Sequence, residues 1–415
     1  MSARTAPESA TAPTATTAPV VTGIGVVAPN GLGTEAWWQA VRRGENGIGP
    51  ITRFDASGYP ARLAGEVTGF DDEANVPSRL LPQTDRMTRL ALFAAAEALA
   101  DARIDAASLP DYAAGVVTAS SAGGFEFGQR ELQALWSKGS SHVSVYQSFA
   151  WFYAVNSGQI SIRHQFRGPS GVVVSGDAGG LDAVAQARRH VRKGTRLMVS
   201  GGVDSALCPW GWTAQLAGGD LSADDRPDAA YRPFAARPGG QVAGEGGALL
   251  VLEDARAARA RGARVYGAVT GCAAAFDPAG GADALRRAAG NALADAGIGP
   301  EQVGAVFADA AALPGADRAE ATALRQLFGP HGVPVTAPKT MTGRLAAGSG
   351  ALDLAGALLA LRDQLVPPTV HTTAAPEHTL DLVVGAPRPA ALRHVLVLAR
   401  GRGGFHSACV VSSAG

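Results

Sequence analysis

Residues 172–193 read VVVSGDAGGLDAVAQARRHVRK, and their pattern indicates a strand, a glycine turn and a helix. The apolar residues 172–175 predict a short strand, residues 176–180 a tight turn, and residues 181–193 a helix that ends in basic residues. This order is typical of a site that presents a nucleophile, because the residue at the turn lies at a helix N-terminus, where the dipole stabilises an anion. Here the turn carries Asp177 in place of serine or cysteine.

Strands and helices alternate on both sides of this unit. Short apolar or β-branched runs predict strands at 20–27, 115–120, 197–203, 247–253, 265–270, 305–308, 395–399 and 407–411. Helical spacing predicts helices at 34–43, 86–102, 125–138, 254–262, 282–296, 317–328 and 350–361. The order restarts after the charged residues 254–262, which could connect two halves. Alternating elements in both halves predict an α/β fold with two related layers.

The composition argues against several classes of protein. At 415 residues the chain is too long for one small core and suits two ordinary domains. Its 36 basic residues balance 36 acidic ones, so charge gives no reason to expect nucleic acid or an anionic membrane as a partner. No apolar run approaches the roughly 20 residues needed to span a bilayer, and the first residues lack a signal-peptide pattern.

The three cysteines are Cys208, Cys272 and Cys409. Their odd number and wide spacing predict neither a metal site nor a disulfide framework. They fit a reducing cytoplasm, which is the location we expect. We interpret them as small hydrophobic residues of the core.

Several separated segments, in the right order, resemble the β-ketoacyl synthases. The elbow of that family, which carries the cysteine that accepts the acyl chain, is similar to Gly168-Pro169, the strand that follows and Gly179-Gly180-Leu181-Asp182-Ala183. Its other signatures resemble residues 21–25, 232–234, 244–246 and 403–405. The resemblance runs the length of the chain and implies a thiolase-like fold, in which two similar α/β halves form a layered αβαβα core. We place a disordered tail at 1–19 and the two halves at 20–257 and 258–415.

All three condensing residues of that family are replaced. Active members use the elbow cysteine and two histidines, and the elbow position here is Asp177. The first histidine precedes an Asp-Arg-x-Glu element, which is present at residues 317–320, and its position is Asp309. The second follows a Lys-x-x-x-Gly segment, which begins at Lys339, and its position is Arg344. A carboxylate does not replace a thiolate in thioester exchange, and an ionised aspartate has no proton with which to polarise a carbonyl.

This loss of residues on a retained scaffold is similar to the chain length factors, or ketosynthase β subunits, of type II polyketide synthases. The runs KTMTGR at 339–344 and SVYQSFAWFYAVN at 144–156 are typical of that group. The resemblance implies a heterodimer with an active ketosynthase α subunit that supplies the cysteine and histidines. This chain would then set polyketide chain length in the biosynthesis of an aromatic antibiotic or pigment. The acyl carrier protein would deliver malonyl units on its own phosphopantetheine, and neither a metal nor another cofactor is expected.

Two other functions stay open. The elbow residue of chain length factors is usually glutamine, which has been assigned a part in malonyl decarboxylation. The chain could therefore be a malonyl-acyl-carrier-protein decarboxylase that primes the synthase through Asp177, although its departure from glutamine counts against this. A third alternative is an inactive homodimeric relative with a binding role.

Structural explanations compete with each functional one. Asp177 could be a helix N-cap, worth about 1 kcal/mol. Asp309 and Arg344 are expected to form an ion pair, because an unpaired buried charge is costly. The retained Lys339 and Glu320 could persist for the same packing reason.

Phe125, Gly128 and Leu132 share one face of the predicted helix at 125–138. That face could simply pack in the core. The resemblance instead places it at the heterodimer interface, where it would line the end of the polyketide tunnel. Because glycine has no side chain and leucine is smaller than an aromatic residue, we predict a comparatively long polyketide.

Overall fold

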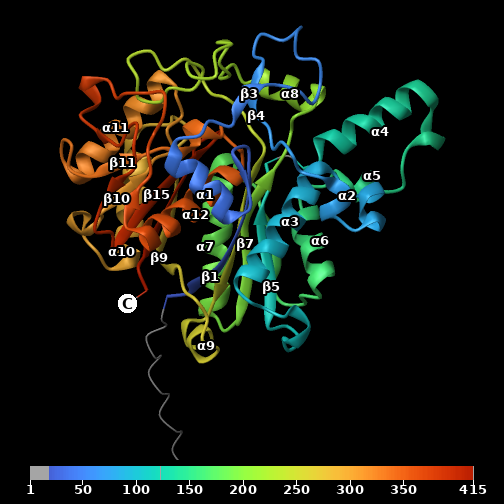
Figure 1. The fold of residues 1–415 in the computed structure, drawn as a ribbon, viewed down its shortest axis with the longest axis horizontal. Helices are drawn as coiled ribbons and strands as arrows, with labels where there is room; N and C mark the ends of the chain where they lie inside the picture. Colours follow the sequence, from blue (N-terminus) through green and yellow to red (C-terminus); the bar gives the residue numbers. More distant parts are fainter. Residues whose placement is uncertain (1–17, 122, 415) are drawn as a thin grey trace, which may run out of the picture.

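The computed structural model describes residues 18–121 and 123–414, which fold around a twelve-stranded mixed sheet (Figure 1). The N-terminal half supplies strands in the spatial order β6-β5-β7-β8-β1. Their bounds are β1 (Val20–Ala28), β5 (Ala114–Ala119), β6 (Ser170–Val173), β7 (Leu197–Asp204) and β8 (Gly246–Glu253). Strands β5, β6 and β7 are parallel, whereas β8 runs antiparallel to β7 and β1. Strands β1, β5, β7 and β8 are buried along their whole length, as expected where helices cover both faces of a sheet.

The C-terminal half repeats this arrangement as β11-β10-β15-β16-β9. Its strands are β9 (Gly267–Phe276), β10 (Ala305–Phe307), β11 (Pro334–Thr336), β15 (His394–Gly401) and β16 (Phe405–Ser412). Again three neighbouring strands are parallel, and the next, β16, is antiparallel to both of its neighbours. The two halves join where β1 pairs antiparallel with β9. Two short strands extend the sheet, β2 (Gly31–Leu32) beside β1 and β13 (Asp381–Leu382) beside β11.

Helices form the remaining layers. The central layer holds α7 (Gly179–Arg192) and α12 (Gly348–Asp363), which contact each other, and α12 packs on β8 of one half and β15 of the other. The outer layers are α3 (Arg86–Asp101) with α6 (Val155–His164), and α10 (Ala282–Ala296) with α11 (Pro314–Phe328). The predicted αβαβα fold with two similar halves is therefore confirmed.

One segment projects from this layered body. Helices α4 (Phe125–Lys138) and α5 (Gln147–Ala150) lie in the connection between β5 and β6, and α4 extends away from the sheet (Figure 1). The remaining elements are α1 (Thr34–Arg43), α2 (Asp72–Asn75), α8 (Pro209–Leu216), α9 (Ala255–Ala260), and the strand pairs β3 (Ile48–Pro50) with β4 (Leu63–Gly65) and β12 (Leu365–Val366) with β14 (Arg388–Pro389).

Most of the predicted elements are present, with shifted ends. The helices predicted at 34–43, 125–138 and 282–296 have the predicted bounds. The strand predicted at 172–175 begins and ends two residues earlier, because its parallel pairing with β5 covers residues 170–173. The predicted boundary between 257 and 258 falls inside α9 and stays a prediction. The predicted tail at 1–19 lies outside the described residues except for its last two.

Candidate functional site

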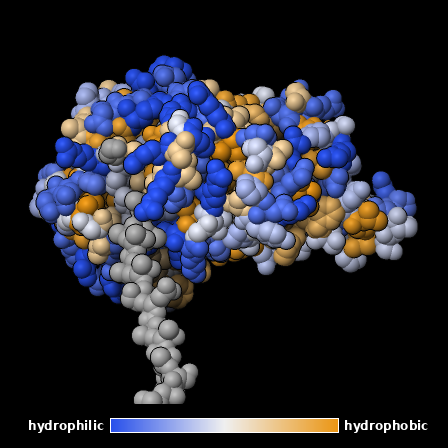
Figure 2. Space-filling view, turned by 90° about the horizontal axis from the view of Figure 1, so that it is seen from below, coloured by the Kyte–Doolittle hydropathy of each residue, from blue (hydrophilic) through white to orange (hydrophobic). Residues whose placement is uncertain are grey.

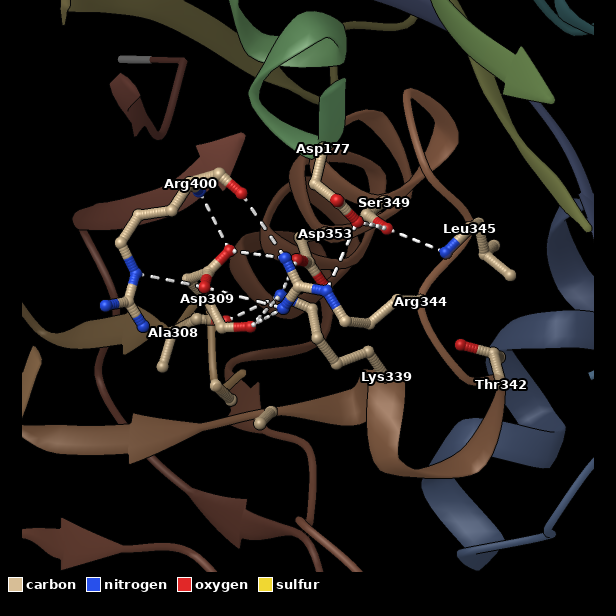
Figure 3. A network of polar contacts seen from close by, with 12 residues as sticks. Asp177, Ala308, Asp309, Lys339, Thr342, Arg344, Leu345, Ser349, Asp353 and Arg400 are labelled. Atoms are coloured by element: carbon tan, nitrogen blue, oxygen red, sulfur yellow. Dashed lines mark hydrogen bonds and ion pairs between the residues drawn. The ribbon is translucent and has the colours of Figure 1, made fainter. Parts of the chain in front are cut away.

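The elbow after β6 is a single 3-10 turn, Gly176–Ala178, that leads into α7. Its Asp177 carboxylate does not cap that helix, whose N-cap residue Ala178 makes no side-chain capping bond. Instead, Oδ1 of Asp177 accepts a hydrogen bond from Ser349 Oγ at 3.0 Å and lies 3.3 Å from Arg344 Nε (Figure 3). The interpretation of Asp177 as an N-cap is therefore wrong, because these two residues draw its carboxylate toward α12.

The predicted pair of Asp309 and Arg344 is confirmed. Nη2 of Arg344 lies 3.1 Å from Oδ1 of Asp309, and Nη1 donates to the Asp309 carbonyl at 2.9 Å. Both side chains are buried. Figure 3 shows Arg344 reaching Asp177 on one side and Asp309 on the other, so the three degenerate positions form one network.

Arg400, at the end of β15, belongs to the same network and was not predicted. Its Nε lies 3.1 Å from Oδ2 of Asp309, and its backbone N–H donates to Oδ1 at 2.8 Å. Its Nη2 lies 3.2 Å from Oε2 of Glu320. In the sequence this segment resembles only a glycine-rich loop before the last strand. An arginine that ends the apolar run HVLVLAR was the available signal.

These charges set the protonation of the network. Although burial opposes ionisation of Asp309, the guanidiniums of Arg344 and Arg400 hold the pKa of its carboxyl well below the usual range. Burial likewise disfavours the charged form of Arg344, but the carboxylates of Asp177 and Asp309 raise its pKa well above the usual value. Neither side chain therefore donates or accepts a proton near neutral pH.

The retained residues hold the backbone that carries Asp309. The Glu320 carboxylate accepts the backbone N–H groups of Asp309 and Ala310 at 2.7 and 2.8 Å. Nζ of Lys339 donates to the Asp309 carbonyl at 3.1 Å and lies 2.6 Å from Oδ2 of Asp353. The cluster pairs its buried charges, as buried charges require, and it positions a loop without presenting a nucleophile or a base.

Two cavities flank the network. The larger, about 420 Å³, is lined on one side by Phe125 and Phe405. The smaller, about 240 Å³, is lined by Asp309, Arg400 and His406 among others. Residues common to both cavities are Asp177, Gln241, Arg344 and Arg402. The ion pair of Asp177 and Arg344 thus forms part of the wall between them.

The three predicted tunnel residues lie in different surroundings. Phe125 lines the larger cavity and packs against Trp210, with ring centroids 4.9 Å apart. A Cβ added to Gly128 would lie 2.8 Å from Cδ1 of Trp151 and 3.0 Å from Cζ3 of Trp210, and Leu132 is 36% exposed. The open space expected beside Gly128 is absent among the described residues, because the two indoles fill it. A role of this face in a tunnel stays a prediction.

Within residues 18–121 and 123–414, no helix combines the length and the apolar character needed to cross a bilayer. In the same part of the chain, no three or more histidine, cysteine, aspartate or glutamate side chains are grouped so that they could hold a metal ion.

Comparisons with known proteins place this geometry in a family. The model of the β-ketoacyl synthase N-terminal domain matches residues 18–258, and that of the C-terminal domain matches residues 263–373. The chain is 58% identical to a Streptomyces coelicolor protein named as the actinorhodin polyketide β-ketoacyl synthase 2, over 94% of this chain and 97% of that protein. It is 56% identical to the tetracenomycin polyketide synthase ketoacyl synthase β subunit of Streptomyces glaucescens, over the same shares of the two chains.

Solved structures agree with these relatives. The ishigamide ketosynthase/chain length factor superposes with a TM-score of 0.89 at 26% identity, over 97% of this chain and 100% of that chain. A type II polyketide synthase acyl-carrier protein in complex with its ketosynthase, bound to the hexaketide, contains a chain that superposes with a TM-score of 0.87. The identity there is 25%, over 96% of this chain and 99% of that one.

Proposed function

The chain belongs to the β-ketoacyl synthase family, within it to the polyketide ketosynthase β subunits, and from this we propose that it is a non-condensing, chain-length-setting subunit. It pairs with an active ketosynthase α subunit, which performs the condensations. An acyl carrier protein brings malonyl units to the pair. The product is a polyketide of the kind used in antibiotic biosynthesis.

One observation carries this proposal. The three positions that hold cysteine and two histidines in active members hold Asp177, Asp309 and Arg344, and these side chains form one paired charge network. Arg344 stays protonated, and Asp309 stays ionised because its pKa is held well below the usual range. Condensation needs a nucleophile that becomes acylated, and the network supplies none. It also needs a donor to the thioester carbonyl, but the N–H groups of the Arg344 guanidinium are already directed at Asp177, Asp309 and the Arg400 carbonyl.

The surface around β6 supports a partner. β6 ends the sheet, so one edge of its backbone has no neighbouring strand among the described residues. Val174, which follows it, is 47% exposed, and Trp136 and Val145 on the projecting segment are 83% and 84% exposed. In Figure 2 hydrophobic side chains gather toward this end of the molecule. An open sheet edge beside exposed apolar side chains suits association with another chain.

Chain length would be set where the larger cavity meets this surface. Phe125 lines the cavity and begins α4, the helix that projects toward the proposed partner. Trp151 covers Gly128 and is 44% exposed, so it is held less firmly than a core residue. A growing chain that reached this point would need the Trp151 indole to move aside. We therefore assign Trp151, with Phe125, Gly128 and Leu132, to the end of the tunnel.

The decarboxylase alternative receives no support from the site. The Asp177 carboxylate is held by Ser349 and Arg344. A repelling negative charge at this place would not help a malonyl carboxylate to bind.

The test is reconstitution from purified components. The chain, its cognate α subunit and the two together are incubated with malonyl-loaded acyl carrier protein, and products are measured by mass spectrometry. We expect polyketide of one dominant length from the pair and none from this chain alone. The variant Trp151→Ala, which opens the space over Gly128, should shift the pair toward longer products. Val384→Ala, at a similarly exposed apolar residue of the C-terminal half, serves as control. Multiple condensations by this chain alone would overturn the proposal.

A further inference from the structure

Two cysteines that are distant in the sequence lie side by side in the structure. Cys272 is on β9 and Cys409 on β16, and they are direct partners in the antiparallel register of these strands. Their sulfur atoms are 3.1 Å apart, and both are free thiols. Partners that face each other across two strands point to the same side of the sheet. The sequence spacing predicted no pairing of cysteines, because the contact depends on the pairing of β9 with β16.

The backbone at this pair suits a disulfide. The backbone N–H of Cys272 donates to Oδ2 of Asp295 at 3.0 Å, so it is turned away from Cys409. The two cysteines are therefore a non-hydrogen-bonded pair, the kind in which the Cα atoms are closer, about 4.5 Å apart. Disulfides join residues with Cα atoms about 4.4 to 6.8 Å apart, so the strands need little movement.

The two thiols differ in access. Cys409 is 1% exposed and packs in the central core, whereas Cys272 is only partly buried at the edge of that core. Cys409 donates its S–H to the Cys272 sulfur, and this hydrogen bond, with burial, raises the pKa of the Cys409 thiol. Cys272 is thus the sulfur that an oxidant reaches, and Cys409 is the thiol beside it. Cys208 is buried elsewhere and accepts a hydrogen bond from Gly211.

We propose that Cys272 and Cys409 are an oxidative modification site, a dithiol that hydrogen peroxide converts into a reversible intramolecular disulfide. In the first step the Cys272 thiol attacks peroxide, its sulfur is oxidised to a sulfenic acid, and one water leaves. In the second step the Cys409 sulfur attacks that sulfenic sulfur, the S–S bond forms, and a second water leaves with the Cys409 proton. Two thiols lose two electrons in total, and one peroxide is reduced to two waters.

The experiment treats the full chain with hydrogen peroxide and counts free thiols before and after. The chain has three cysteines, and we expect the count to fall from three to one, with a peptide containing Cys272 linked to one containing Cys409. Dithiothreitol should restore all three thiols. The Cys208→Ser variant should form the same link, whereas Cys272→Ser cannot form it and should keep both of its remaining thiols after the same treatment.

A second measurement keeps the test informative if a variant folds poorly. The oxidised wild-type protein should melt at a higher temperature than the reduced protein, because the link closes a long loop of the unfolded chain. Three results would overturn the proposal: a thiol count that stays at three, oxidation of Cys272 to sulfinic or sulfonic acid without a link, or a link that involves Cys208 or a second molecule.

Discussion

The two halves share one strand order but differ in an equivalent connection. In the N-terminal half, residues 120–169 join β5 to β6 and include α4, α5 and α6. In the C-terminal half, residues 308–333 join β10 to β11 with α11 alone, which packs on α10. The first connection projects and exposes large apolar side chains, whereas the second is compact and holds Asp309 and Glu320 in the buried charge network.

The two connections therefore suit different roles in the protein. The exposed connection of the N-terminal half suits contact with another chain. The compact connection of the C-terminal half fixes the loop that carries Asp309. The buried charges of Asp309, Glu320 and Arg344 lie in the C-terminal half and the exposed apolar surface lies in the N-terminal half, so substitutions in the two connections should have different consequences.

The largest effect is expected from Arg344→Ala. This change leaves Asp177 without a cation and Asp309 with Arg400 alone, in a buried site. Breaking a buried ion pair from one side costs about 3–5 kcal/mol of folding free energy. Urea unfolding should show this loss, and Arg226→Ala, at a surface ion pair, should leave the unfolding midpoint unchanged. Equal midpoints for both variants would mean that the network does not hold the C-terminal half together.

The next effect concerns the projecting connection. Trp136→Ser should weaken association with the α subunit by about 2 kcal/mol, roughly 30-fold, since exposed tryptophans at interfaces are often dominant contacts. Val145→Ser should weaken it less. The matched control is Val384→Ser, because Val384 is an exposed valine of the C-terminal half. Titration calorimetry measures the affinities. Unchanged affinity for both Trp136→Ser and Val145→Ser would show that this segment is not part of the interface.

The pH dependence of stability separates two aspartates of the compact connection. Burial raises the pKa of Asp317 from 3.8 to about 7. Between these values the unfolded chain ionises while the folded protein keeps the proton, so this residue makes stability fall as pH rises from about 4 to about 7. Asp309 has a lowered pKa and therefore the opposite effect on stability. Its contribution to the free energy of unfolding is present above about pH 4 and is lost as the pH falls below that value.

Asp317→Asn checks this assignment. Asparagine keeps an oxygen that can accept the Phe234 N–H, which Asp317 accepts at 2.8 Å. Unfolding at about pH 5 and about pH 7.5 should therefore show a smaller decrease in stability for the variant than for the wild type. The same decrease in both proteins would show that Asp317 titrates normally.

The smallest effect is expected at the elbow. Asp177→Asn keeps an oxygen for Ser349 and Arg344, and Arg344 still has Asp309, so the variant should lose less than about 1 kcal/mol of stability. Product length and yield from the pair should stay the same. A sharp fall in yield without an external starter, for Asp177→Asn and Asp177→Ala alike, would instead give Asp177 a part in priming.

Features that depend on local residue patterns, or on the cost of burying a charge, could be predicted from the sequence. The elbow, the two halves and the pairing of Asp309 with Arg344 follow from glycine placement, strand alternation and the cost of a lone buried charge. Arg400 was missed because an arginine beside a glycine-rich turn is also typical of exposed hairpins. The filling of the space beside Gly128 was missed because Trp151 and Trp210 reach it through tertiary packing, which helical spacing does not reveal.

The most direct test of the account is a crossed inactivation of the two subunits. One pair contains this chain unchanged and an α subunit whose elbow cysteine is replaced by alanine, and the other contains Asp177→Ala and an unchanged α subunit. Condensation is followed with malonyl-loaded acyl carrier protein by mass spectrometry of the released products. The account predicts no condensation in the first pair and undiminished condensation, with the same product length, in the second. Condensation that survives in the first pair and disappears in the second would place the chemistry in this chain and contradict the account.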